Sequence, residues 1–193
     1  MGKKILIING HPNADSFNFG IAKAYREGAA KAGAEIEEIV IAELNFNPNL
    51  QFGYQKRTEL EPDLLKAWEK IQWAEHLVWI HPVWWGGLPA ITKGFIDRLF
   101  LPGFAFQYRE NSSLWDGLLK GKTAHIITTL DQPSLFYRFY FGRPSVNQLK
   151  RSVLKFCGIR PVRVSYIGII KGSKPEIRKK WLEKVENWGE RLK

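Results

Sequence analysis

The sequence predicts one α/β domain over residues 1–193, built on a three-layer, doubly wound parallel sheet of five strands in the order 2-1-3-4-5. Three observations lead to this fold class. The 193 residues suffice for one core, short β-branched apolar runs alternate with longer segments of helical periodicity, and no repeat, low-complexity tract or linker divides the chain. Strands joined through helices pair in parallel by right-handed crossovers, which fits this order.

The first strand, helix and second strand follow one another closely. Lys4–Asn9 is a continuous β-branched run, as expected for a central parallel strand covered on both faces. Asp15 or Ser16 can cap the helix that follows, whose apolar residues recur every three or four positions until Gly33 closes it. The second strand is predicted at Glu35–Ile41.

The middle of the chain supplies two helices around a third strand. Pro62 and the neighbouring acidic residues are typical of a helix start, so a helix is predicted from Leu64 to about Ala74. Leu77–His81 is the third strand. A further helix runs through Ile91 to Leu99 and ends before Pro102.

The last third completes the sheet. Lys122–Thr128 is predicted as the fourth strand, and the aromatic segment 131–145, with its two prolines, as a long loop of the kind that often carries function. A helix over 146–157 follows. Val162–Ile169 is the fifth strand, and Pro175–Leu192 forms a final amphipathic helix.

Composition and charge restrict the classes of function. The net charge is +10, and residues 120–193 carry 17 basic and 5 acidic side chains, so the second part of the chain is the basic one. Such a surface can attract nucleic acid, an anionic membrane or a phosphate-bearing cofactor. Because the charges are scattered through helices and loops, solvated side chains are the favoured interpretation, and we expect no nucleic-acid partner.

Neither a membrane span nor a metal centre is expected. No apolar run approaches the roughly 20 residues that a span requires, and the N-terminal apolar run is too short for a signal peptide, so we predict a cytoplasmic protein. The single cysteine, Cys157, excludes an internal disulfide and a cysteine zinc cluster. Its apolar neighbours predict a small buried hydrophobic residue.

The loops after three strands hold the unusual residues. In a doubly wound sheet the ligand lies beyond the carboxyl ends of the strands, near the switch in strand order. The loops after Asn9, His81 and Thr128 are therefore predicted to surround one crevice.

The first of these loops, Asn9–Asn18, leads from a strand into a helix. Backbone N–H groups at a helix start form a site for phosphate, and Ser16 and Asn18 can add side-chain donors. The loop has neither the Walker A sequence nor the GxGxxG fingerprint, which disfavours an ATPase or a Rossmann dehydrogenase. The alternative is a simple turn capped by Ser16, with His11 as a structural histidine.

The other two loops carry aromatic and hydroxyl side chains. Trp84 and Trp85 stand together after a buried strand, where a flat aromatic ligand would give both a role. A dimer interface is the rival interpretation of these tryptophans, and both roles are compatible. Thr128 and Thr129 could hydrogen-bond the polar edge of a ring system, although polar residues are also ordinary at strand ends.

These stretches resemble the NAD(P)H:quinone reductase branch of the flavodoxin-like superfamily. The similar segments are GHP…SFN (10–18), PVWWGGLPAITKGFIDRLFLPGFAF (82–106), the run 120–129 and FCGIRPVR (156–163), in the same order and spacing. The resemblance covers nearly the whole chain.

The resemblance implies a homodimeric flavoprotein that binds FMN or, as the alternative, FAD. Residues of the first loop would hold the flavin phosphate and ribityl chain, and those of the other two would line the isoalloxazine ring. The implied cofactor-binding residues are His11, Ser16, Phe17, Asn18, Pro82, Val83, Trp84, Trp85, Thr128, Thr129 and Leu130.

The resemblance also implies a reaction. NAD(P)H would pass a hydride to the flavin, leave, and be replaced in the same slot by a quinone or similar small acceptor, in a two-electron ping-pong cycle. Trp85 would help to form the wall of that slot. Family members place a glycine pair, then a tyrosine and a histidine, after the paired threonines; here Leu130 and Asp131 stand there, no histidine follows, and Tyr137 or Tyr140 would supply the phenol. Tyr137 and Trp85 are our candidates for the catalytic residues.

Three choices stay open at this point. The sequence does not decide between FMN and FAD, between NADH and NADPH, or among acceptors. A different class of function is a nucleotide-binding regulatory subunit of a membrane ion-efflux system, as some relatives are, with the basic C-terminal helix as the docking surface. A one-electron shuttle of flavodoxin type is disfavoured, because those proteins have an acidic docking face.

Overall fold

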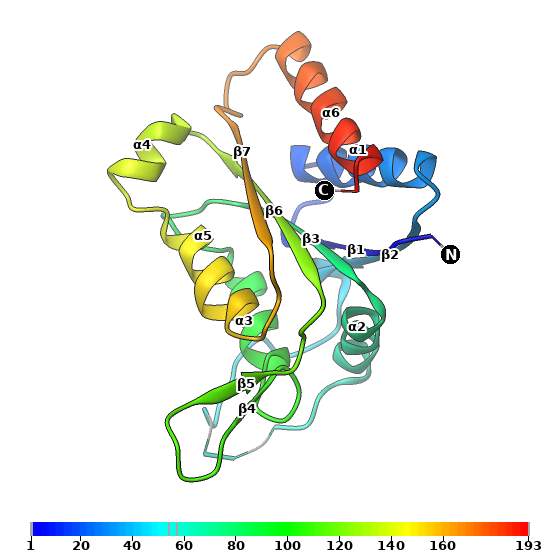
Figure 1. Cartoon of the computed structure of the whole chain (residues 1–193). Coiled ribbons are helices and arrows are strands. Elements are labelled where there is room, and N and C mark those ends of the chain that lie inside the picture. The colour runs from blue at the N-terminus through cyan, green and yellow to red at the C-terminus, as the bar shows by residue number, and fades with distance from the viewer. Residues whose placement is uncertain (1, 54, 57, 193) are drawn as a thin grey trace.

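The computed structural model describes residues 2–53, 55–56 and 58–192. Its main sheet is parallel and five-stranded, in the order β2-β1-β3-β6-β7, which confirms the predicted 2-1-3-4-5 arrangement (Figure 1). Each strand lies within two residues of its predicted limits. The strands are β1 (Lys4–Asn9), β2 (Glu35–Val40), β3 (His76–Pro82), β6 (Thr123–Leu130) and β7 (Val162–Gly168).

Helices cover both faces of this sheet. One face packs against α1 (Phe17–Lys31) and α6 (Pro175–Glu190), through a cluster that includes Ile21, Tyr25 and Val185. The opposite face packs against α2 (Pro62–Trp73), α3 (Ala90–Leu99) and η2 (Gln148–Lys155), a π-helix. The doubly wound, three-layer prediction therefore holds (Figure 1).

Two glycines let α1 and α6 approach closely. A Cβ at Gly28 would lie 2.0 Å from the carbonyl oxygen of Glu186, and one at Gly189 would lie 2.3 Å from the carbonyl oxygen of Tyr25. Backbone atoms cannot yield to such a side chain. The contact therefore depends on both glycines and holds the C-terminal helix on the sheet.

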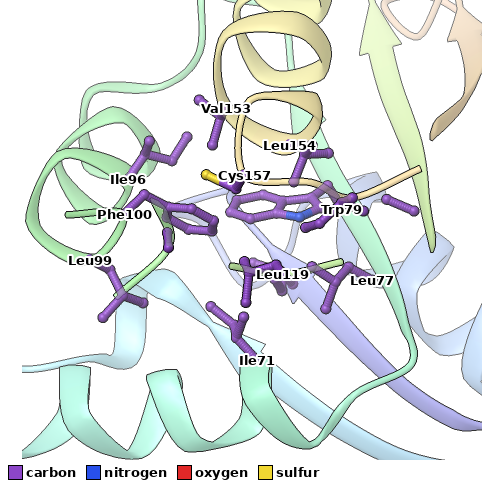
Figure 2. Packing of buried hydrophobic residues seen from close by; sticks show 14 of the residues in the cluster. Ile71, Leu77, Trp79, Ile96, Leu99, Phe100, Leu119, Val153, Leu154 and Cys157 are labelled. Atoms are coloured by element: carbon purple, nitrogen blue, oxygen red, sulfur yellow. The ribbon is translucent and has the colours of Figure 1, made fainter. Parts of the chain in front are cut away.

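The larger core cluster surrounds Trp79, which is 1% exposed on β3 (Figure 2). Residues from several elements converge on its indole, among them Ile71 of α2 and Leu154 of η2. Cys157 lies at the edge of this cluster and is 2% exposed, which confirms its prediction as a small buried hydrophobic residue. Burial raises the pKa of its thiol to about 12, so the thiol stays protonated and unreactive.

The segment 131–145 is not the continuous loop that we predicted. It contains α4 (Ser134–Phe139), and α5 (Pro144–Asn147) begins before the predicted start of the helix at 146 and continues directly into η2. The two prolines that favoured a loop instead occupy the N-cap of α4 and the first turn of α5, positions that lack an intrahelical N–H partner in any case.

Sequence reasoning also missed two short elements. β4 (Phe106–Tyr108) and β5 (Trp115–Gly117) form an antiparallel hairpin beyond the main sheet, and η1 (Ile41–Glu43) follows β2. No helix of the described residues is both long and apolar enough to cross a membrane. Within the same residues, no group of three or more His, Cys, Asp or Glu side chains could hold a metal ion.

Candidate functional site

The loop after β1 is fixed by short-range hydrogen bonds and by α3. Asn9 Oδ1 accepts from the backbone N–H of His11 at 3.1 Å, and His11 Nδ1 accepts from that of Asn13 at 3.0 Å. Thr92 Oγ1 on α3 donates to the carbonyl oxygen of Gly10 at 2.9 Å. A Cβ at Gly10 would lie 2.4 Å from that hydroxyl, so only glycine fits this close contact. The loop is therefore held in one shape before any ligand binds.

The start of α1 carries buried donors that the protein leaves without partners. Ser16 occupies the N-cap, but its side chain makes no capping hydrogen bond, contrary to the simple-turn alternative. Ser16 Oγ and Asn18 Nδ2 are both buried without a hydrogen-bond partner among the described residues. A buried polar group without a partner costs about 1–3 kcal/mol. Such donors at the positive end of a helix dipole are suited to an anionic ligand.

The double-tryptophan loop forms a tight turn. Trp84 and Gly87 exchange two backbone hydrogen bonds, of 3.1 and 2.8 Å. The two residues between them, Trp85 and Gly86, have φ of 50° and 76°, the left-handed pair of a type I′ turn. Trp85 is fully exposed, whereas Trp84 is 44% exposed and meets the edge of His11 at 5.5 Å between ring centroids. A non-glycine residue at positive φ is strained, and such strain concentrates at functional sites.

The paired threonines at the end of β6 face opposite sides of the sheet, because successive side chains in a strand alternate. Thr129 Oγ1 donates to Asn18 Oδ1 at 2.9 Å and so ties β6 to α1. Thr128 is completely buried, beside His81 in the register of β3 and β6, and its hydroxyl has no partner within the described part of the chain. Burial lowers the pKa of His81 to about 3, so this imidazole is neutral.

The three loops converge on one pocket of about 190 Å³. Nine of the eleven predicted cofactor-binding residues line it: His11, Ser16, Phe17, Asn18, Pro82, Val83, Trp84, Thr129 and Leu130. Thr128 and Trp85 do not, because one points into the core and the other into solvent.

Two lining residues were absent from our prediction. Asp131 follows β6, and Ile170 follows β7, where its N–H donates to the carbonyl oxygen of Leu130 at 2.9 Å. Extending the carboxyl-end rule to the fifth strand would have identified Ile170.

The pocket is nearly free of charge. Burial lowers the pKa of His11, which favours the neutral imidazole. Asp131 is then the one lining residue with a formal charge among those that the structure describes. A larger cavity of about 480 Å³ lies between α3, the β4–β5 hairpin and η2, but none of the three strand-end loops lines it.

Tyr137, our candidate catalytic residue, lies outside the pocket. Its side chain is 0% exposed, and its hydroxyl lies 2.6 Å from Ser145 Oγ and donates to the carbonyl oxygen of Gly86 at 3.3 Å. The backbone N–H of Ser145 also donates to this hydroxyl, at 3.1 Å. These contacts join the α4–α5 segment to the double-tryptophan turn. The catalytic role of Tyr137 stays a prediction.

The model of a family described as having a flavodoxin-like fold matches residues 3–192. The chain belongs to this family. Its flavodoxin-like sheet carries these loops at the carboxyl ends of β1, β3 and β6.

Two curated relatives confirm the branch of the family. An uncharacterized NAD(P)H oxidoreductase of Haemophilus influenzae is 30% identical, over 92% of this chain and 90% of its own. NAD(P)H dehydrogenase [quinone] 1 of Rattus norvegicus is 25% identical, over 98% of this chain and 76% of its own.

Solved structures agree with these relatives. Smu.1420 of Streptococcus mutans UA159 superposes with a TM-score of 0.84 at 36% identity, over 97% of this chain and 98% of its own. An FMN-dependent NADH-azoreductase of Bacillus anthracis, solved in complex with FMN, superposes with a TM-score of 0.71 at 22% identity, over 100% of this chain and 99% of its own. The second likeness concerns the fold alone.

Proposed function

We propose that this flavodoxin-like protein is a flavin-dependent NAD(P)H oxidoreductase that holds FMN in the strand-end pocket and reduces quinones or similar small acceptors. One observation carries the proposal: the buried donors Ser16 Oγ and Asn18 Nδ2 lie unpartnered at the start of α1, in the same pocket as Pro82, Val83 and Trp84. The donors suit a phosphate tail, and the apolar residues suit a flat ring. An FMN molecule combines both features.

Two features of the chain support FMN as the cofactor. The phosphate would lie at the α1 N-terminus, where two side-chain donors join the backbone N–H groups. The ring would lie against Pro82, Val83 and Trp84, and the edge contact of His11 fixes the orientation of the Trp84 indole. The FMN dependence of the Bacillus anthracis azoreductase, which shares this fold, supports the choice of FMN over FAD.

The residues of the chain orient the reactants, and the bound flavin would accept a hydride and return electrons in pairs. Thr129 positions Asn18 through its hydroxyl, and Asn18 keeps its amide N–H groups free for the ligand. The fully exposed Trp85 would form the wall of the slot that NAD(P)H and the acceptor occupy in turn. In this ping-pong proposal one slot serves both substrates.

A second copy of the chain would complete the site. The pocket of about 190 Å³ falls below the roughly 300–1,000 Å³ usual for small-molecule sites. Trp85, next in sequence to the lining residue Trp84, is exposed, and so are Phe139 and Tyr140, of and beyond α4. Exposed aromatic surface of this extent is typical of an interface. We therefore propose a homodimer in which the partner covers the open side.

Absorption spectroscopy tests the proposal directly. Purified protein, as isolated or after addition of FMN, is expected to show a bound yellow chromophore that bleaches with NADH or NADPH under anaerobic conditions and recovers when a quinone is added. A colourless protein that binds neither FMN nor FAD by fluorescence titration would falsify the assignment.

The variant Ser16→Ala tests the phosphate contact. It removes a hydroxyl without a partner and should leave the free energy of unfolding of the apoprotein unchanged or slightly higher. Affinity for FMN, measured by flavin fluorescence quenching, should fall by about tenfold, because a hydrogen bond to a charged group is lost. Ser152→Ala, on η2 outside this pocket, is the matched control and should bind FMN normally.

The regulatory-subunit alternative receives no support from the comparisons. None of the four proteins named above is described as part of an ion-efflux system.

A further inference from the structure

A second hollow, of about 330 Å³, lies beside β7 and is bordered by α4, α5 and η2. Five basic side chains line it: Arg138, Arg143, Lys150, Arg151 and Lys155. Arg138 lies on α4, Arg143 is the N-cap of α5 and the other three lie on η2, so the fold brings them around one concavity. The hollow is distinct from the strand-end pocket, with which it shares no lining residue.

These cations lack anionic partners. None of the five forms an ion pair within 4.0 Å in the described part of the chain, although ten other ion pairs are present there. Arg143 Nε is buried and has no hydrogen-bond partner among the described residues, and Arg143 has a strained φ of 59°. The sequence explains the missing partners, because residues 132–175 contain nine Lys and Arg and no Asp or Glu.

The cations also repel one another. The pKa of Lys150 is lowered, first by burial of its ammonium group and then by the charges of Lys155, Arg143 and Arg151. The guanidinium of Arg138 lies 5.7 Å from the ring centroid of Tyr166, which keeps it at the hollow. A multiply charged anion at the centre would relieve this repulsion and satisfy the free donors.

One layer of side chains separates the two hollows. Leu130, Tyr137 and Val146 form a small buried cluster, against which Val83 and Tyr166 pack. Leu130 and Val83 line the strand-end pocket, whereas Val146 and Tyr166 line the basic hollow. The two hollows therefore lie on either side of this cluster.

We propose that the basic hollow binds a phosphate group carrying two or more negative charges. Arginine and lysine supply the bidentate and point-charge donors that phosphate oxygens prefer. A concave site surrounded by cations fits a compact anion better than the extended backbone of a nucleic acid. Two sources share this chemistry. One is the 2′-phosphate of NADPH, and this choice rests on the proposed function. The other is a free organic phosphate, and this choice does not depend on the proposed function.

Isothermal titration calorimetry of the flavin-free and flavin-loaded protein tests binding without turnover. Inorganic pyrophosphate and adenosine 2′,5′-bisphosphate are the probes, at physiological ionic strength. The variant Lys150→Gln/Arg151→Gln should bind both at least about tenfold more weakly than wild type. The control Lys179→Gln/Lys180→Gln removes the same charge from exposed positions of α6 and should bind normally.

Two results overturn the proposal. One is the absence of measurable binding of either probe to wild type, and the other is an equal loss of affinity in the control variant, which would indicate a diffuse charge effect. Urea unfolding of both variants excludes misfolding as the cause. Because these measurements need no catalysis, failure of the proposed function leaves them interpretable.

Steady-state kinetics then distinguishes the sources. If the 2′-phosphate of NADPH occupies the hollow, Lys150→Gln/Arg151→Gln raises the KM for NADPH by about tenfold and leaves the KM for NADH unchanged. If a free phosphate occupies it, both KM values stay unchanged while the calorimetric affinity for pyrophosphate falls. Either pattern, together with the calorimetric loss, supports the phosphate site.

Discussion

The strand-end pocket and the basic hollow lie on either side of the same small cluster, yet they are built from opposite kinds of polar group. The strand-end pocket presents neutral donors, such as Ser16 Oγ and Asn18 Nδ2, and burial keeps its His11 neutral. The hollow presents five cations, and burial lowers the pKa of Lys150. The ordinary pKa of histidine is near neutrality, so a small lowering by burial makes the imidazole neutral at pH 7. A lysine needs a much larger lowering of its pKa to lose its charge.

The difference predicts how each site responds to salt and pH. Interactions between partly exposed charges are screened over about 8 Å at physiological ionic strength, whereas hydrogen bonds from buried neutral donors are not. Phosphate binding to the hollow should therefore weaken steeply with salt, and FMN binding should change little. Under the two proposals, neutral groups would hold the cofactor and charged groups would hold a second anion.

Lowering the pH is expected to produce the largest change in the free energy of unfolding, through the buried imidazole of His81. The unfolded chain binds a proton at His81 below pH 6.5, but the folded chain does so only near pH 3, so stability is lost as the pH falls through this window. Between pH 6.5 and 5 the loss from His81 should be about 2 kcal/mol. Urea unfolding at pH 7 and pH 5 measures it.

The variant His81→Gln should show a flatter dependence of unfolding free energy on pH than wild type, whatever its absolute stability. His11→Gln is the comparison variant, because the His11 pKa is lowered in the same direction but its ring is partly exposed. An unchanged slope in His81→Gln would contradict the neutral state of this buried imidazole.

The paired threonines provide the next test, since one belongs to the pocket and the other does not. Thr129→Val leaves Asn18 Oδ1 buried without its donor and should lower the unfolding free energy by about 2 kcal/mol and weaken FMN binding. Thr128→Val removes a hydroxyl that has no partner in the described chain, so stability should be unchanged or higher. Equal effects of the two substitutions, in urea unfolding and flavin titration, would refute the assignment of Thr129 to the site.

Tyr137 belongs to the cluster between the two sites, and its contacts favour a positioning role. Tyr137→Phe should lower the unfolding free energy by about 1 kcal/mol, because the hydroxyl bonds to Ser145 and Gly86 are lost. The value of kcat should fall by less than about tenfold, whereas loss of a general acid or base typically lowers it by about 10²–10⁴-fold. A decrease in the larger range, with altered pH dependence of kcat, would restore Tyr137 as the catalytic residue.

The smallest expected change in the free energy of unfolding is at Trp85. There, a substitution that relieves backbone strain should also weaken substrate binding. A left-handed conformation costs an L-residue roughly 1–2 kcal/mol, and a glycine at the same position avoids this cost. Glycine also loses about 0.5–1 kcal/mol more backbone entropy on folding, which offsets part of the gain. Trp85→Gly should therefore stabilise the protein by about 0.5–1 kcal/mol in thermal or urea unfolding while raising the KM for the quinone. Trp84→Gly, at a residue without positive φ that contacts His11, should destabilise it.

The outline of the fold was predictable because its signals are local. The central strand β1, Lys4–Asn9, is a nearly continuous apolar run, and the long helices α1 and α6 show a periodic apolar face. The β4–β5 hairpin has no such signal, since Phe106–Tyr108 and Trp115–Gly117 are three residues each and mostly exposed. The helix α4 was missed because its stability comes from one buried anchor, Tyr137, and not from a periodic apolar face.

By itself, the sequence determined that alternating strands and helices form a doubly wound sheet, and so which loops lie at its carboxyl edge. The order 2-1-3-4-5 fits this alternation, and the structure confirmed it. Only the tertiary structure decided which side chains of those loops face the pocket. Thr128 and Thr129 are neighbours in sequence but point to opposite faces of the sheet, and the five cations of the basic hollow are scattered along three elements until these pack against β7. Alternation along the strand separates Thr128 from Thr129, but only the packed structure shows which of the two faces the pocket.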